Sequence, residues 1–257
     1  MNQSIQVNSD PAVRYLLRLG DTCLIHAQRL SEWCGHAPIL EEDIALTNIA
    51  LDLIGQARAV LTLAGAIEGR GHSEDQLAFL RNERDYLNPT LVELPRGDFA
   101  LTTLRNLAVS TLMVLLWDGL RSSRNAELSA IAGKALKEAL YHQRHAVDWC
   151  VRLGDGTEES RRRMNQALTA LWPYVPELFE SDPDDELASA EGLGPTWASL
   201  QTAWRDAMGE VLEEARLAPP KETAFRSTGR LGRHSEHMGY ILAEMQHLQR
   251  AYPGGSW

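Results

Sequence analysis

The chain has 257 residues, and its 35 Asp and Glu against 25 Lys and Arg leave a formal net charge of −10. This balance argues against a nucleic-acid partner, because the phosphate backbone repels an acidic chain without a dense basic patch. A hydrophobic fraction of 44% and a charged fraction of 23% are those of an ordinary globular protein. We therefore expect a hydrophobic core large enough to be stable without disulfides or metals.

Three features predict a cytoplasmic location with no membrane partner. The cysteines are odd in number and lack metal-ligand spacing, which suits a reducing compartment; they are Cys23, Cys34 and Cys150. Residues 1–11 lack the basic start and apolar stretch of a signal peptide. The longest apolar stretch, residues 107–117, is too short to span a bilayer.

Nearly every long segment has apolar residues at helical spacing, and no alternating run indicates a sheet. The first part of the chain predicts helices over residues 11–34, 41–67, 73–86, 98–121 and 125–153. The four long helices form two hairpins with short connections, so the members of each hairpin are antiparallel neighbours. A longer crossover, which includes residues 87–97, joins the two hairpins.

The last third of the chain is less regular. Helices are expected over residues 158–179, with a kink or break at two prolines, and over residues 196–217 and 235–252. Between the first two of these, residues 181–186 predict an acidic loop. The whole chain, residues 1–257, is interpreted as one all-α domain. Its core bundle spans about residues 11–153, and the C-terminal helices, about residues 158–252, pack on that core.

Two antiparallel helix hairpins joined by a crossover describe a ferritin-like four-helix bundle. That fold builds di-iron sites from one Glu on each of two helices and a Glu-x-x-His on each of the other two. The polar residues at the corresponding depth of this chain are Asp21, Asp52, Glu138 and His142.

This set is incomplete as a di-iron site. Gly55 and Tyr141 stand where the two ligand histidines are expected, three residues after Asp52 and Glu138. At the corresponding depth, the third long helix has the sequence Ala-Val-Ser at residues 108–110 and no carboxylate. Because such sites require a strict number and geometry of ligands, we expect no metal and no catalytic residue here.

Two interpretations of the four residues stay open at this stage. In the first, Asp21, Asp52, Glu138 and His142 form a buried polar cluster, in which His142 is protonated or shares a proton with Glu138 and bridges toward Asp52. In the second, they are the unusual ligand set of an independent di-iron or di-manganese oxidase. Metal analysis of the protein distinguishes the two.

Two further motifs lie near the C-terminus. One Glu-x-x-His, formed by Glu244 and His247, and the neighbouring pair His234 and His237 are interpreted as a solvated or partner-facing part of the last helix. A basic loop precedes that helix and offers a contact to the phosphates of CoA or to partner carboxylates, with a merely solvated loop as the alternative; its arginines are Arg226, Arg230 and Arg233.

Many short stretches resemble one family, the C subunits of bacterial phenylacetyl-CoA monooxygenases (1,2-phenylacetyl-CoA epoxidases). The resemblance covers nearly the whole chain, and its most specific segments are residues 15–21, 30–36, 41–45, 51–58, 91–95, 97–99, 152–157, 177–179 and 242–246. Further matches are Arg84, Lys137–Glu138, Tyr141–His142 and Glu236–His237.

The resemblance implies a ferritin-like fold and a place in a complex that epoxidises the ring of phenylacetyl-CoA in aerobic phenylacetate catabolism. In that family the di-iron centre lies in the catalytic A subunit. Electrons come from NADPH through a reductase that contains FAD and an iron–sulfur centre. The C subunit is the structural partner of the A subunit and has no cofactor of its own. The function implied for this chain is therefore that of a non-catalytic subunit.

Overall fold

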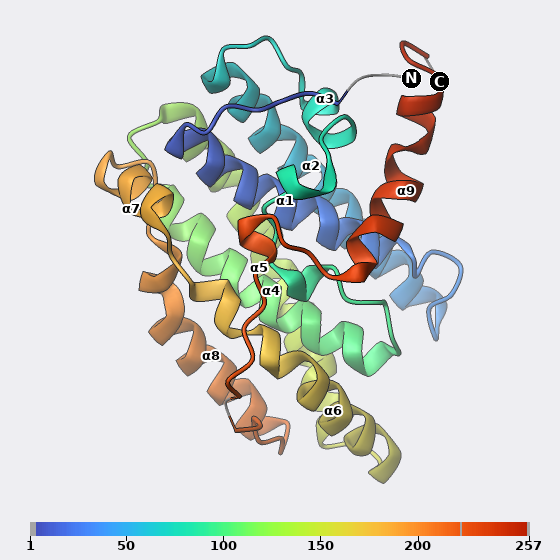
Figure 1. The fold of residues 1–257 in the computed structure, drawn as a ribbon. Helices are drawn as coiled ribbons and strands as arrows, with labels where there is room; N and C mark the ends of the chain where they lie inside the picture. The colour runs from blue at the N-terminus through green and yellow to red at the C-terminus, as the bar shows by residue number, and fades with distance from the viewer. Residues whose placement is uncertain (1–3, 222, 256–257) are drawn as a thin grey trace. The chain divides into compact units, whose positions relative to one another are not determined.

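The computed structural model describes residues 4–221 and 223–255, and this part of the chain contains helices and turns but no named strand. Its α-helices are α1 (Pro11–Ser31), α2 (Leu40–Glu68), α3 (Glu74–Phe79), α4 (Phe99–Leu120), α5 (Ala126–Gly154), α6 (Glu158–Leu171), α7 (Pro183–Ala190), α8 (Gln201–Glu214) and α9 (Glu236–Ala251). The predicted all-α class is confirmed (Figure 1).

The chain divides into two compact units. Unit 1 comprises Met1–His36, Glu41–Pro95 and Ser227–Trp257, and unit 2 comprises Ala37–Leu40 and Arg96–Arg226. Unit 1 therefore contains α1, α2, α3 and the distant C-terminal helix α9, whereas α4 to α8 form unit 2. The prediction of a single domain over residues 1–257 stays a prediction.

In unit 1, α1 and α2 form the expected antiparallel hairpin. The backbone N–H of Asn8, just before α1, donates to Glu68 at the end of α2 over 3.0 Å. The two helices approach closely at Gly20, where an added Cβ would lie 2.9 Å from Leu61 Cδ2. The C-terminal helix α9 packs against α1, against α3 and against the 3-10 turn η1 (Glu83–Asp85).

In unit 2, α4 is the central helix and packs against α5, α6 and α8. It is buried on nearly every side, which explains why its sequence is apolar all round rather than along one stripe. The Phe99 ring at the start of α4 meets the Trp149 ring near the end of α5 edge-on, 5.1 Å between centroids. This contact confirms the second antiparallel hairpin.

Helices α2 and α4 are long and apolar enough to cross a membrane, by length and composition alone. The apolar window of α4 is longer than the apolar stretch at residues 107–117. However, 78% of that window and 56% of the α2 window are buried. A buried core helix of a soluble protein can have the same length and apolar composition.

Two predicted boundaries differ from the structure, and a predicted break is present. The helix expected over 73–86 is only α3, which begins at a Ser73–Gln76 capping box; η1 follows it after a break. The segment expected to be helical over 158–179 is broken near its two prolines, as predicted: α6 ends at Leu171, and the 3-10 turns η3 (Trp172–Tyr174) and η4 (Pro176–Phe179) follow. The first helix ends at Ser31, so that Cys34 lies in an exposed turn.

The prediction of an acidic loop at residues 181–186 is wrong. Residues 183–190 form α7, because Asp182 caps the helix by accepting from the Asp185 N–H over 3.1 Å and Pro183 occupies its first turn. The acidic residues that suggested a loop lie in this first turn, where the helix dipole favours negative charge.

Candidate functional site: a buried polar network

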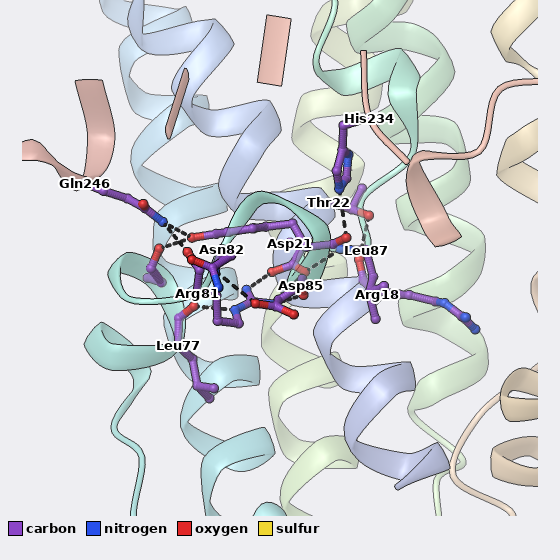
Figure 2. Close-up of polar contacts among 12 residues, drawn as sticks. Arg18, Asp21, Thr22, Leu77, Arg81, Asn82, Asp85, Leu87, His234 and Gln246 are labelled. Carbon is purple, nitrogen blue, oxygen red and sulfur yellow. Dashed lines mark hydrogen bonds and ion pairs between the residues drawn. The ribbon is translucent and has the colours of Figure 1, made fainter. Parts of the chain in front are cut away.

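A buried polar network in unit 1 centres on an ion pair between Asp21 of α1 and Arg81, just after α3 (Figure 2). Both side chains are fully buried. The Arg81 guanidinium contacts both carboxylate oxygens, with Nη1 donating to Oδ2 over 3.0 Å and Nη2 to Oδ1, and the Leu87 N–H donates to Oδ2 over 2.9 Å. Such a two-pronged pair fixes orientation as well as charge.

Backbone carbonyls take up the remaining donors of Arg81. Its Nε donates to the Leu77 carbonyl over 2.5 Å and its Nη1 to the Asp85 carbonyl over 2.8 Å. The guanidinium also lies 4.2 Å from the centroid of the Tyr86 ring. Burial opposes the charge of Arg81, but Asp21 outweighs it, so the pKa of Arg81 is raised. The Arg81 guanidinium therefore carries its charge in the folded protein at any ordinary pH.

The C-terminal helix α9 closes the network from the other side. Gln246 Nε2 donates to the Arg81 carbonyl over 3.0 Å and to the Tyr86 hydroxyl over 2.7 Å (Figure 2 shows Gln246 pointing toward Arg81). Arg250 Nη2 donates to the same Arg81 carbonyl over 2.8 Å. Burial raises the pKa of Tyr86 to about 12, although Arg81 opposes the shift. The phenol therefore stays protonated and can donate to the Ala78 carbonyl.

A second buried centre forms around Glu93. His234 Nδ1 lies 2.5 Å from Glu93 Oε1, and its Nε2 lies 2.9 Å from the Tyr86 carbonyl. Because both ring nitrogens face acceptors, the doubly protonated imidazolium fits the site. Burial lowers the pKa of His234, but the hydrogen bond and charge of Glu93 outweigh burial, so the pKa is raised.

The other groups around Glu93 complete its hydrogen bonding. Ser235 donates to Oε2 from its N–H and from its hydroxyl, each over 2.8 Å, and Asn88 Nδ2 donates to Oε1 over 3.0 Å. Arg29 of α1 holds the Glu93 carbonyl through Nε and Nη2, over 3.0 and 2.7 Å. Each acid of the two centres thus has a cationic partner and further donors. Their chemistry favours anchoring of α9 and residues 81–93 rather than proton transfer.

The four residues expected at the bundle centre have different surroundings. Asp21 belongs to the network above, and Asp52 on α2 is half-buried. On α5, His142 belongs to the row of buried residues. Glu138 is half-buried, and its Oε1 lies 3.6 Å from Lys134 Nζ. Asp21 and Asp52 belong to unit 1 and the α5 pair to unit 2. The proposed cluster of all four stays a prediction.

These residues do not fit a di-iron centre. The Asp21 carboxylate already holds a guanidinium, which competes with a metal cation for the same oxygens. Gly55, where a ligand histidine is expected, has no donor atom and is exposed. Within residues 4–221 and 223–255, no three His, Cys, Asp or Glu side chains group in a way that could hold a metal ion.

The C-terminal motifs divide between surface and interior. Glu244 and His247 are exposed, as expected. The interpretation of His234 as a solvated residue is wrong, since its side chain is fully buried against Glu93. The only sequence signal for the contact between His234 and Glu93 was a histidine just before a helix. Nothing in the sequence around Glu93 indicated that it would be the partner. His237 is half-buried, with its Nε2 3.9 Å from Glu236 Oε1.

The three arginines before α9 do not form one exposed basic loop. Arg226 is exposed and lies 3.7 Å from Glu180, Arg233 is exposed, and Arg230 is buried, with 3% of its surface accessible. This burial corrects the expectation that Arg230 offers a surface contact to CoA or a partner. The residues that build the network, Arg81, Tyr86 and Glu93, were not among the sequence candidates.

An all-α chain with two antiparallel hairpins and a degenerate set of bundle carboxylates is a protein of the ferritin-like class. The family model described as "Phenylacetic acid catabolic protein" matches residues 1–257. The chain is also 48% identical over 243 residues to the C subunit of 1,2-phenylacetyl-CoA epoxidase from Escherichia coli (strain K12), covering 95% of this chain and 98% of that protein. The chain therefore belongs to the phenylacetic acid catabolic protein family, and its role lies in phenylacetate catabolism.

Proposed function

We propose that this chain is a non-catalytic structural subunit that supports the catalytic A subunit of a phenylacetyl-CoA epoxidase complex. The observation that carries the proposal is an exposed apolar seam on α2, defined by Ile44, Leu51 and Ile54. Their accessible fractions are 53%, 59% and 37%. With Thr47 between them, these residues recur at alternating spacings of three and four, the pattern of a helix that packs against another helix.

An exposed seam of this kind is costly in a monomer and supports a protein partner. The Escherichia coli relative suggests that partner, because an epoxidase with a C subunit has other subunits as well. The donor set around Asp21 does not fit a metal, which supports a role without catalysis or a cofactor in this chain. On this proposal the di-iron centre belongs to the A subunit and the NADPH, FAD and iron–sulfur chemistry to a reductase. The complex is cytoplasmic, without nucleic acid or membrane.

Co-expression with the A subunit, followed by size-exclusion chromatography with mass measurement, tests the proposal. The wild-type chain should elute with the A subunit, and Leu51→Lys should separate the two proteins at micromolar concentration. Leu187→Lys on α7 is the matched control, because Leu187 is similarly exposed at 52% but lies outside the seam. If the Leu51→Lys variant eluted with the A subunit to the same extent as wild type, the proposal would be contradicted. A homodimer of this chain that Leu51→Lys dissociates would also contradict it, because the seam would then bind a second copy of this chain.

Metal analysis of protein grown with iron separates this role from that of an independent oxidase. The purified chain should bind no stoichiometric iron. Two equivalents of iron that are lost on Glu138→Ala would instead favour the di-metal oxidase.

A further inference from the structure

The C-terminal helix α9 has an exposed face that combines large side chains with a groove. On its inner side α9, the red helix of Figure 1, packs against α1, α3 and η1. On its outer side Tyr240 and Leu248 have accessible fractions of 72% and 51%. Next to them lies a shallow groove of about 400 Å³, whose exposed lining residues come from successive turns of α9: Gly239, Ala243, His247 and Ala251. The proposed contact of α2 with an A subunit leaves this face unused.

The exposed residues of this face follow two neighbouring lines along the helix. Tyr240, Glu244 and Leu248 are spaced four residues apart and form a ridge, because residues at this spacing lie on one line of a helix surface. Ala243 and Ala251 lie on the adjacent line, in the groove. Helices pack when the ridge of one enters the groove of the other. A helix that fits this face therefore has large side chains opposite the two alanines and small ones opposite the ridge.

A second copy of α9 meets both requirements when it is antiparallel to the first and related to it by a two-fold axis between residues 245 and 246. In this register Tyr240 faces Ala251 of the second copy, and Leu248 faces Ala243. Glu244 faces His247 of the second copy, so a carboxylate meets an imidazole N–H twice in the pair. We propose that this face of α9 binds the same face of a second copy of this chain.

The dimer should be weak. A contact made by one helix of each copy buries less than a standard interface, which places the dissociation constant on the order of 1–100 µM. Sedimentation velocity of the full-length chain alone, from about 5 to about 500 µM, should follow conversion of the monomer of 28.6 kDa into a species of twice that mass. A chain that stays monomeric throughout this range would overturn the proposal.

A substitution in the groove tests the location of the contact. Ala243→Arg places a long charged side chain where Leu248 of the second copy fits, and it should weaken the dimer by about tenfold or more. Ala130→Arg is the matched control, because Ala130 is also an exposed helical alanine but lies on α5. Dimerisation of Ala243→Arg with wild-type affinity would overturn the assignment to this groove.

A charge exchange tests the antiparallel register. His247→Glu places two carboxylates opposite each other at both symmetric positions and should weaken the dimer about tenfold. Glu244→His combined with His247→Glu restores a carboxylate opposite an imidazole, and its affinity should return to within about threefold of wild type. A double variant that stays as weak as His247→Glu would overturn the register.

The α9 contact and the α2 seam can be separated. Leu51→Lys should leave this dimer unchanged, because Leu51 lies on α2. A dimer that Leu51→Lys dissociates and Ala243→Arg does not would overturn the proposal. Because the chain is measured alone, the results do not depend on its assembly with an A subunit.

Discussion

Glu93 and His234 are 141 residues apart in the sequence and meet in the interior of unit 1, with His234 Nδ1 2.5 Å from Glu93 Oε1. The contact joins the segment after η1 to the residue two positions before α9. Since both side chains are fully buried, the charge on the imidazole depends on its acidic partner, and so does the attachment of the C-terminal segment.

His234 should make stability depend on pH. Its folded-state pKa is raised above the ordinary value of 6.5, because Glu93 outweighs the opposing effect of burial. The stabilisation is therefore fully present below pH 6.5 and is lost as the pH rises through the folded-state pKa. The difference in free energy of unfolding between wild type and His234→Gln should shrink at alkaline pH. His247→Gln, at an exposed position, is the control. A difference that stays constant with pH would contradict the charged pair.

The Asp21–Arg81 pair should be strongly coupled. Arg81→Leu leaves a buried carboxylate without its cation and should lower the free energy of unfolding by about 3–5 kcal/mol. Urea denaturation of the two single variants and of the double variant measures this coupling. The loss in free energy of unfolding for Asp21→Leu combined with Arg81→Leu should be smaller than the sum of the two single losses by about 0.5–3 kcal/mol.

Arg58→Ala is the control for this pair. Arg58 Nε lies 3.3 Å from Glu74 Oε1, but 73% of the Arg58 side chain is exposed, so the loss should stay below about 1 kcal/mol. If Arg81→Leu cost no more than Arg58→Ala, the buried network would not exist as described.

Two helical glycines should respond in opposite directions to alanine. At Gly65 in α2 an added Cβ would lie 2.3 Å from the His72 carbonyl oxygen, so Gly65→Ala should shift the backbone and destabilise the protein by about 1–3 kcal/mol. At Gly133 in α5 nothing lies within 4 Å of that Cβ, and Gly133→Ala should stabilise by about 0.5–1 kcal/mol. Thermal melts of the two variants compare them directly, and equal shifts would contradict the close approach at Gly65.

The three free cysteines should differ in reactivity toward a thiol reagent. Cys34 is exposed, whereas Cys23 and Cys150 are buried, and burial raises the pKa of Cys150 to about 12. The native chain should therefore release one equivalent of chromophore rapidly with a disulfide reagent, and denaturant should release the rest. Cys34→Ser should remove the fast phase. A fast phase that persists in Cys34→Ser would show that a buried thiol is accessible.

The sequence by itself determined the four long helices and the two hairpins, and it showed Gly55 and Tyr141 where a regular di-iron pattern has histidines. Helical periodicity and caps such as Asn125 and Asp98 act within a few residues, so they can be recognised without knowledge of distant contacts. The same local reasoning failed at residues 181–186, where a cap and a proline outweighed the acidic composition.

Only the tertiary structure decided which polar residues are partners. Asp21 was expected beside Asp52, and the structure pairs it with Arg81, 60 residues away. His234 preceded a helix that was expected to be solvated, and Arg230 belonged to a basic run, but both are buried. No local pattern encodes such contacts. A buried charge takes its partner from whichever segment the packing of apolar faces brings beside it, and that packing joins residues far apart in the chain.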